Sequence, residues 1–244
     1  MLKRVFDFVA SGVGLVLASP VLLPVMFLVW RQDGHSPFYV AERVGQNDRL
    51  FKMVKLRSMV INADKSGVDS TGANDNRITA VGRFIRRIKF DEFPQLWNVL
   101  KGEMSLVGPR PNVQRETDLY TSEEKRLLSV RPGITDISSI VFADEGSILE
   151  GRPDPDLAYN QLIRPYKSRL GLLYVEHAGV FLDVHLILLT LLSAVNRRAA
   201  LNQVGGIVAK LGASRELITV ALRQEPLQPA PPPGATEIVA SRGI

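Results

Sequence analysis

The longest apolar run of the chain lies near its N-terminus. Between Asp7 and Arg31, the 23 residues from Phe8 to Trp30 include no charged side chain. As a helix rising about 1.5 Å per residue, they would extend about 35 Å, enough to cross the hydrocarbon core of a bilayer. The pattern therefore predicts a membrane helix. A secretory signal peptide is the alternative, but the run is long and is followed by no small-residue cleavage site.

Two prolines interrupt this apolar run. Ser19-Pro20 lies at its middle and Pro24 follows one turn later, and a proline removes a backbone hydrogen bond and kinks a helix. Each half would cover only about 15 Å, so one interpretation is a helix that breaks at Ser19 and Pro20 and leaves by the face it entered. The other is a single kinked transmembrane helix, in which Ser19 or a neighbour satisfies the freed carbonyl. Both interpretations fit the pattern.

The remainder of the chain alternates between shorter elements. Two strands are predicted at 37–45 and 49–59, joined by a turn, and the polar stretch 66–76 is predicted to be a loop. A second apolar stretch, 181–193, is too short to span a membrane and predicts a buried or interface-lying helix. The tail 224–244, with five prolines in 226–233, is expected to be disordered or extended. Helical patterns occupy 77–89, 92–101, 112–129, 155–176, 179–197 and, more weakly, 205–223.

The amino-acid composition excludes cysteine-based sites and favours an anionic ligand. The 244 residues include no cysteine, which excludes thiol nucleophiles, Cys-ligated zinc, iron–sulfur clusters and disulfides. Residues 77–115 contain eight basic and three acidic side chains, an excess equal to the net charge of +5 for the whole chain. The aromatic residues of this segment have the spacing of core positions, so a polyphosphate ligand held by a few Arg and Lys fits better than nucleic acid. Solvated surface charge is the simpler alternative.

Two adjacent carboxylates, Asp91 and Glu92, lie within this basic segment and precede Pro94. One interpretation is structural, because Asp is a preferred helix N-cap and both Glu and Pro are well tolerated in a first turn. The other is chemical, because a carboxylate surrounded by cations stays ionised and could attack phosphorus while its neighbour binds Mg²⁺.

Several motifs, in order and spacing, resemble the bacterial monotopic phosphoglycosyl transferases, also called the bacterial sugar transferase family. The resemblance covers roughly residues 1–195. The motifs are KRxFDF, the apolar ASP break, VKLRSM, DxRIT-GRFIRR, FDEFPQLWNVLKGEMSLVGPRP and VRPGIT. The resemblance implies an enzyme that transfers a sugar-1-phosphate from a UDP-sugar to undecaprenyl phosphate, releases UMP and initiates surface polysaccharide or glycoconjugate assembly.

The resemblance also implies roles for particular residues. Asp91 would be the nucleophile that forms a covalent phosphosugar intermediate, and Glu92 would help to bind the cofactor Mg²⁺. The phosphates would be bound by basic residues at the family's motif positions. These are Lys55, Arg86, Arg110 and Arg131.

The expected fold is mainly α with a small β element (α+β), in which a re-entrant membrane helix and interface-lying amphipathic helices surround a compact catalytic core. The expected segments are the re-entrant helix at 1–33, the catalytic domain at 34–198, a helical extension at 199–223 and a Pro-rich disordered tail at 224–244. The resemblance favours re-entry over spanning, with Ser19 and Pro20 as the break. It places the protein at the bacterial inner membrane, with the catalytic domain on the cytoplasmic face, in the small form without a multi-span N-terminal module.

One segment departs from the family pattern. Many members continue after PGIT with a GWAQVNGR-like stretch, whereas residues 136–143 here read DISSIVFA. The expected partners are the UDP-sugar, undecaprenyl phosphate and membrane lipid, with no nucleic acid and with a second copy of the chain as one option. Two other functions compete: a membrane-anchored basic binding protein without turnover, and a phosphohydrolase that passes the intermediate to water.

Overall fold

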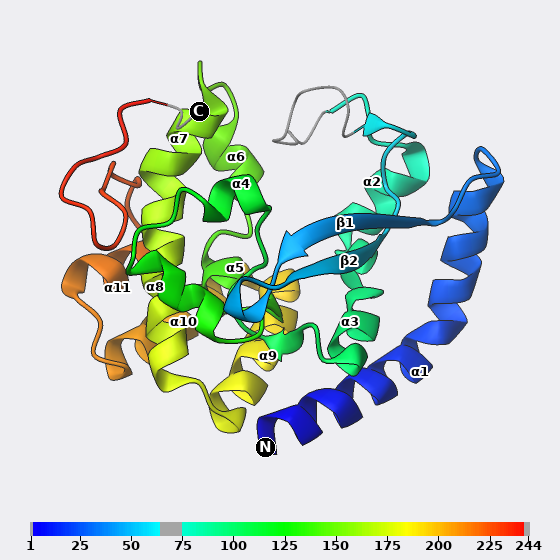
Figure 1. Cartoon of the computed structure of the whole chain (residues 1–244), viewed down its shortest axis with the longest axis horizontal. Coiled ribbons are helices and arrows are strands. Elements are labelled where there is room, and N and C mark those ends of the chain that lie inside the picture. The colour runs from blue at the N-terminus through cyan, green and yellow to red at the C-terminus, as the bar shows by residue number, and fades with distance from the viewer. Residues whose placement is uncertain (1, 64–74, 242–244) are drawn as a thin grey trace.

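A computed structural model describes residues 2–63 and 75–241. Within these residues the fold is mainly helical, with two small two-stranded sheets, as the sequence predicts. Figure 1 shows the N-terminal helix α1 along one side, the hairpin at the centre and the C-terminal helices on the opposite side. The loop predicted at 66–76 lies almost wholly outside the described residues.

The elements follow one another in the order of the chain. The first group is α1 (Leu2–Arg31), β1 (Phe38–Val44), η1 (Gln46–Asp48), β2 (Leu50–Leu56), α2 (Ala80–Arg87), η3 (Phe90–Glu92), α3 (Gln95–Lys101) and β3 (Ser105–Val107). The second group is α4 (Gln114–Thr117), η4 (Glu124–Ser129), β4 (Gly133–Thr135), α5 (Ile137–Val141), α6 (Glu145–Leu149) and α7 (Pro155–Ala158). The last group is the π-helical segment η5 (Tyr159–Ile163), α8 (Arg164–His177), α9 (Val180–Val195), α10 (Arg197–Lys210) and α11 (Arg215–Leu222).

Helix α1 is the one helix among the described residues that is long and apolar enough to cross a membrane. It runs without interruption through Ser19 and Pro20, so the expected break is wrong and the prolines instead lie inside a curved helix. Pro20 lacks the N–H that would bond to Val16, and the Ser19 hydroxyl donates to that carbonyl at 2.7 Å. The backbone therefore bends without losing its hydrogen bonding at this carbonyl.

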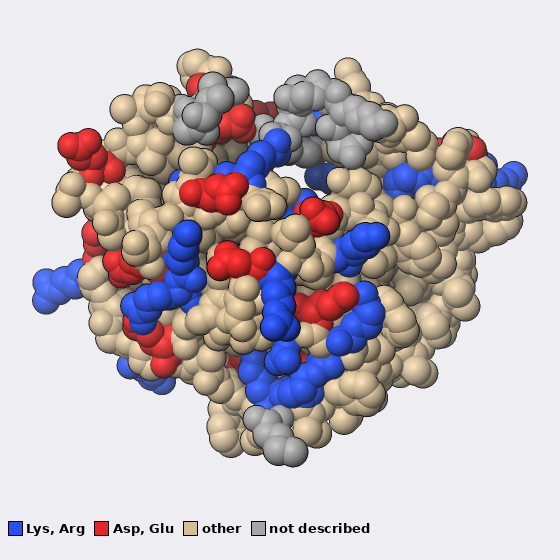
Figure 2. Space-filling view, viewed as in Figure 1, with Lys and Arg blue, Asp and Glu red and all other residues tan. Residues whose placement is uncertain are grey.

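The two faces of α1 have different surroundings. Its buried residues recur every three, four or seven positions and face the protein, packing on α3 and on the region around β2 and α2. The opposite face is apolar and exposed. Figure 2 shows that few charged side chains lie on the flank formed by α1, whereas they gather over the centre of the molecule. The exposed residues include Leu2, Val5, Phe8, Val9, Val13, Val16, Leu17, Val21, Leu23, Phe27, Leu28 and Trp30.

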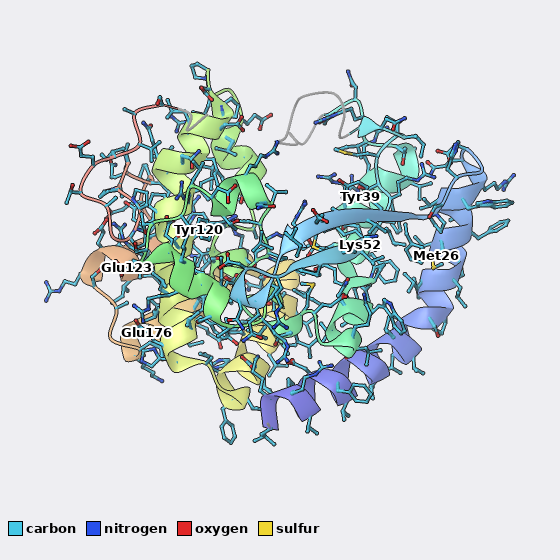
Figure 3. All side chains as sticks on the ribbon, viewed as in Figure 1. Met26, Tyr39, Lys52, Tyr120, Glu123 and Glu176 are labelled. Atoms are coloured by element: carbon cyan, nitrogen blue, oxygen red, sulfur yellow. The ribbon has the colours of Figure 1, made fainter. Side chains whose placement is uncertain are left out.

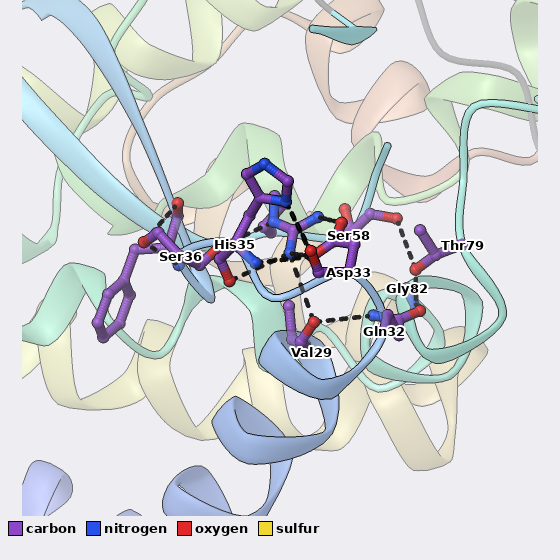
Figure 4. Close-up of polar contacts among 10 residues, drawn as sticks. Val29, Gln32, Asp33, His35, Ser36, Ser58, Thr79 and Gly82 are labelled. Atoms are coloured by element: carbon purple, nitrogen blue, oxygen red, sulfur yellow. Dashed lines mark hydrogen bonds and ion pairs between the residues drawn. The ribbon is translucent and has the colours of Figure 1, made fainter. Parts of the chain in front are cut away.

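Both ends of α1 are fixed to the rest of the protein. At the N-terminal end, Lys3 pairs with the buried Asp183 of α9, and the Asp7 carboxylate accepts from Ser105 and from the backbone of the next residue at 2.9 and 3.1 Å. At the other end, Arg57 donates to Asp33 at 2.6 and 2.7 Å and to the Val29 carbonyl at 3.4 Å. Figure 4 shows this second network, in which the Arg57 hydrogen bonds lower the pKa of Asp33 to about 2. The curved helix thus begins and ends on the same body.

The hairpin is confirmed as predicted. β1 and β2 pair antiparallel, with Ala41 opposite Met53 and Phe38 opposite Leu56. Figure 3 labels Tyr39 on β1 and Lys52 on β2, with Met26 on α1 beyond them.

Two motif glycines bring distant segments together. β3 and β4 pair in parallel, and the backbone around Gly108 contacts that around Gly133. A Cβ on Gly133 would lie 2.0 Å from the Gly108 nitrogen, a distance that no side chain allows. The glycines of VGPRP and RPGIT therefore permit this close approach, which sets the position of the Arg110 backbone two residues later.

The prediction of one helix at 112–129 is wrong. The structure has two short pieces, α4 and η4, with a new start at Thr121. The Thr121 hydroxyl accepts from the Glu124 amide, and the Glu124 carboxylate accepts from the Thr121 amide, both at 3.1 Å. This reciprocal pair is a capping box, and the sequence TSEE signals it.

The described part of the tail, residues 224–241, contains no helix or strand and is extended against the C-terminal helices. Its backbone makes specific hydrogen bonds: Ala230 donates to the Gln161 carbonyl at 3.0 Å, and the Pro231 carbonyl accepts from Arg169 at 3.0 Å. Gln161 also donates through its side chain to the Val239 carbonyl at 2.7 Å. Along these residues the tail is irregular, with a turn in which Ala235 donates to the Pro232 carbonyl at 3.0 Å.

Candidate active site

The Asp91–Glu92 pair lies on a tight turn between α2 and α3. Lys89 precedes it with φ 53°, a left-handed conformation that costs a residue with a side chain about 1 kcal/mol or more. Phe90 anchors the turn in the same cluster as the second half of α1, and its ring contacts Phe93 at a centroid distance of 4.5 Å. The two carboxylates are thus presented by a short 3₁₀ turn that packs on α1.

Glu92 is bound by two cations from different parts of the chain. Lys55 of β2 donates to its Oε1 at 3.1 Å, and Arg110, from the turn after β3, donates to the same oxygen at 2.5 Å. Burial would raise the pKa of Glu92, but Arg110 and Lys55 outweigh it and hold that pKa far below the usual range. Glu92 also raises the pKa of the Arg110 guanidinium. Glu92 therefore stays ionised across the physiological range.

Asp91 has different surroundings from its neighbour. No ion pair or side-chain hydrogen bond to its carboxylate occurs among the residues that the structure describes. Its pKa is raised, first by burial and then by the charge of Glu92, while Lys55 and Arg86 act in the opposite direction. The result is a carboxylate with unused acceptor oxygens beside two cations, the arrangement that a nucleophile toward phosphorus requires.

The structure brings together some of the predicted phosphate-binding residues and separates one. Lys55 and Arg110 meet at Glu92, and Arg86 is close enough to lower the pKa of Asp91 while donating to the Ser58 hydroxyl at 3.5 Å. Arg131 instead donates to the Gly102 carbonyl at 2.8 Å, at the far end of α3 from the dyad. Its observed contact is with the backbone that ends a helix.

Sequence reasoning did not single out Asn98, which positions one of these cations. Its side-chain oxygen accepts from Val54 at 3.0 Å and its side-chain nitrogen donates to the Lys52 carbonyl at 2.7 Å. Because Asn98 is fully buried in α3, it joins α3 to the strand that carries Lys55. A polar residue among the apolar positions of NVLKG was the available signal.

Asp91 and Glu92 fit a Mg²⁺ ion whose remaining ligands come from substrate phosphates and water. No group of three or more His, Cys, Asp or Glu that could hold a metal occurs in the described part of the chain. Mg²⁺ is commonly bound by one or two carboxylates together with substrate phosphates and water. Among the described residues, no side chain donates to the Asp91 carboxylate, and both cations on Glu92 donate to Oε1 and leave Oε2 without a hydrogen bond.

Exposed apolar side chains lie on the elements that flank the dyad. The pattern predicted core positions for Phe84, Phe90, Phe93 and Trp97, but only Phe90 is buried. Phe84 and Trp97 are more than half exposed. Helical periodicity identifies an apolar face but not whether protein or lipid covers it, which explains the difference.

The sequence that forms this site is similar to a family of known proteins. The pattern of the family described as "Bacterial sugar transferase" matches residues 1–197. The chain is 44% identical over 149 residues to an "Undecaprenyl-phosphate galactose phosphotransferase" of Salmonella typhimurium, covering 55% of this chain and 31% of that protein. It is 41% identical over 155 residues to the "Exopolysaccharide production protein ExoY" of Rhizobium meliloti, covering 57% of this chain and 69% of the relative.

A third relative, from Aeromonas hydrophila, is a "UDP-N-acetylgalactosamine-undecaprenyl-phosphate N-acetylgalactosaminephosphotransferase". It is 36% identical over 143 residues, covering 57% of this chain and 34% of its own length. The chain thus spans about a third of the length of the Salmonella and Aeromonas proteins and about two thirds of the Rhizobium protein.

Proposed function

The chain belongs to the bacterial sugar transferase family, and we propose that it transfers a sugar-1-phosphate from a UDP-sugar to undecaprenyl phosphate at the start of surface polysaccharide synthesis. The observation that carries this proposal is the contrast within the dyad: Glu92 is held by Lys55 and Arg110, whereas no side chain among the described residues donates to the Asp91 carboxylate. The names of the Salmonella and Aeromonas relatives supply the class of donor and acceptor.

The proposed reaction has two steps at phosphorus. An oxygen of Asp91 attacks the phosphorus that carries the sugar, a new P–O bond forms, and the bond to the leaving UMP breaks. A phosphate oxygen of undecaprenyl phosphate then attacks the same phosphorus, and the Asp91 carboxylate is released unchanged. Arg110 and Lys55 bind the donor's phosphates and stabilise the charge that develops on their oxygens.

Asp91 and Glu92 would hold the Mg²⁺ together with the diphosphate of the donor. When bound, the ion neutralises phosphate charge and favours departure of UMP. Glu92 suits this role because its low pKa keeps it ionised and, among the described residues, its Oε2 accepts no hydrogen bond.

The curvature of α1 supports a membrane location for the reaction. A straight 30-residue helix would be about 45 Å long and would place its ends on opposite sides of a bilayer. Here Lys3 binds Asp183 and the other end binds Arg57, so both ends lie on one body, as a re-entrant helix requires. We therefore propose that the catalytic domain lies on the cytoplasmic face of the inner membrane, where nucleotide sugars are made.

The exposed apolar residues around the dyad favour a lipid acceptor over water. A phosphohydrolase would gain nothing from exposed Phe84, Phe93 and Trp97 on the elements that flank the nucleophile. A basic binding protein would not need a carboxylate held among its cations, since that carboxylate repels anions. Helix α9 also has exposed apolar side chains, which include Phe181, Leu188 and Leu191.

The test is UMP release by the purified protein with a panel of UDP-sugars, Mg²⁺ and undecaprenyl phosphate. We expect UMP and a lipid-linked sugar diphosphate from at least one donor, with both lost in Asp91→Asn. UMP release that is equally fast without the lipid would instead identify a phosphohydrolase. Release from no donor, or full activity of Asp91→Asn, would refute the assignment.

The topology has its own test. Single cysteines introduced near Lys3 and near Arg31 should both be labelled by an impermeant thiol reagent only from the cytoplasmic side. Since the protein contains no cysteine, the background is the unlabelled wild-type chain. Labelling of one end from outside would establish the spanning helix.

A further inference from the structure

A narrow pocket is lined in part by Arg110, the residue that also binds Glu92 of the dyad. Its lining includes Arg110, Asn112, Tyr120, Asp136, Tyr159 and Lys167, and it is called the Tyr159 pocket below. Arg110 therefore borders both the proposed reaction centre, through Glu92, and this pocket. A donor whose diphosphate is bound at Arg110 has one of its two ends within reach of the Tyr159 pocket.

The size of the pocket suits small polar groups. Its volume of about 50 Å³ has room for about three or four water-sized groups. Hydroxyl, amino and acetamido substituents, by which the hexoses of nucleotide sugars differ, are of that size.

The aromatic rings of the pocket are covered on one face by cations. Lys167 lies 5.4 Å from the centroid of Tyr159, and Arg164 lies 5.6 Å from that of Tyr120. Lys167 is held there by an ion pair with Glu145. A base that stacks on either of these faces would have to displace a cation that is already fixed. Figure 3 shows Tyr120 in front of α8, the helix that carries both cations.

Two polar groups in the pocket are available to a ligand. Among the described residues, the Tyr159 hydroxyl makes no hydrogen bond, and Asn112 uses only its side-chain nitrogen, which donates to Tyr120 at 2.8 Å. Burial raises the pKa of Tyr159 well above its ordinary value, so its hydroxyl remains a donor at neutral pH. The pocket thus offers one donor and one acceptor that the protein itself does not use.

One wall of the pocket comes from the segment that departs from the family pattern. Asp136 and Ser138, from the segment that departs from the family pattern, form one wall and bond to each other at 2.8 and 2.9 Å. Tyr159 begins the π-helical segment η5, and the tail clasps that segment at Gln161 through both its carbonyl and its side chain. The tail lies beyond the residues that the family pattern matches.

We infer that the Tyr159 pocket receives the ring substituents of the donor sugar, with the Tyr159 hydroxyl and the Asn112 amide oxygen as the groups that discriminate between sugars. This inference rests on the proposed function. The uridine end of the donor then lies on the other side of the diphosphate. Tyr159 and Asn112 determine specificity and take no part in the displacement at phosphorus.

The test removes one oxygen atom with Tyr159→Phe and compares pairs of UDP-hexoses that differ at a single ring substituent. We expect the ratio of kcat/KM within at least one pair to change by about 5- to 10-fold, the effect of one neutral hydrogen bond. Inhibition by UMP, which has no sugar, should stay within about 2-fold. The matched control is Tyr166→Phe, because that hydroxyl bonds to the Gln228 carbonyl of the tail at 2.9 Å, outside the pocket; it should change neither quantity.

Three outcomes would overturn the inference: weaker inhibition by UMP, an equal loss for every sugar, or no change in any ratio. Calorimetric binding of the same UDP-hexoses without acceptor lipid decides the matter independently of turnover. If the wild-type protein releases no UMP, the proposed function fails, while a change in sugar preference of binding in Tyr159→Phe still supports the pocket and its absence still refutes it.

Discussion

Glu92 and Glu124 form ion pairs with an arginine at almost the same distance, 2.5 Å to Arg110 and 2.6 Å to Arg164, yet their surroundings differ. The Glu124 side chain is fully buried, and both its oxygens are occupied by Arg164, by the Ser168 hydroxyl and by a backbone amide. The Glu92 side chain is 19% exposed and uses one oxygen.

The number of carboxylate oxygens that accept hydrogen bonds separates a structural ion pair from a functional one. A buried structural carboxylate is satisfied by the protein at every oxygen, because an unpaired acceptor in the interior is costly. Among the described residues, by contrast, no side chain donates to Glu92 Oε2 or to the Asp91 carboxylate, although Lys55 and Arg110 lie close by. We expect carboxylate oxygens of this kind to bind a ligand. The following predictions test whether Glu92 and Asp91 bind ligands while Glu124 stabilises the fold.

The largest expected effect is on turnover by Asp91→Asn. We expect activity to fall by about 1,000-fold or more, as for other enzymes that lose a nucleophile. The unfolding free energy should stay the same or rise at neutral pH. Because the pKa of Asp91 is raised in the folded protein, its ionisation disfavours folding as pH rises through that pKa, and Asn removes this cost. Chemical denaturation beside the activity assay measures both; a clear loss of stability would mean that Asp91 is a structural cap.

Glu124→Gln should show the reverse behaviour. It leaves the Arg164 guanidinium buried without its counter-charge, so we expect a loss of about 3 to 5 kcal/mol in unfolding free energy. The activity of the protein that remains folded should be close to that of the wild type at low temperature. Glu92→Gln is the matched control, with lost activity and a smaller change in stability. Equal stability losses in the two variants would remove the distinction between the two glutamates.

Arg110→Lys keeps the charge but loses the planar donors that reach Glu92. A reduction of about 10- to 100-fold in kcat/KM is expected, because hydrogen bonds between charged groups are the stronger ones. Arg131→Lys serves as the comparison, since Arg131 contacts the Gly102 carbonyl at the other end of α3. Were Arg131→Lys the more damaging change in kcat/KM, with both variants folded, the phosphates would be bound elsewhere.

The smallest effect concerns pH. Activity should rise with pH as Asp91 ionises, with the acidic limb above the ordinary range of an Asp, because burial and Glu92 raise its pKa. Lys55 lowers the pKa of Asp91, so Lys55→Met should move this limb to higher pH. The measurement is the pH profile of kcat/KM for both proteins. A limb that moves to lower pH in Lys55→Met would contradict the assigned electrostatics.

The sequence predicted the parts of this account that depend on local pattern. Alternation located the hairpin, and the motif around Asp91 located the dyad with Lys55 and Arg110. It did not predict that Phe84 and Trp97 are exposed, because an apolar face has the same periodicity under lipid as in a core. Nor did it predict the contact that Arg131 makes, since the partner is a backbone carbonyl that only tertiary packing brings near. The contacts of the tail with Gln161 join positions far apart in the chain and leave no local signal.

The proposed mechanism depends most on the covalent bond between a carboxylate oxygen of Asp91 and the phosphosugar. Intact-protein and peptide mass spectrometry, after incubation with Mg²⁺ and the preferred UDP-sugar without acceptor lipid, tests this directly. We expect the mass of the peptide that contains Asp91 to increase by one sugar phosphate. The adduct should be lost when undecaprenyl phosphate is added, and it should not form in Asp91→Asn. Efficient transfer to the lipid with the adduct on another residue, or with an adduct that forms equally in Asp91→Asn, would contradict this mechanism.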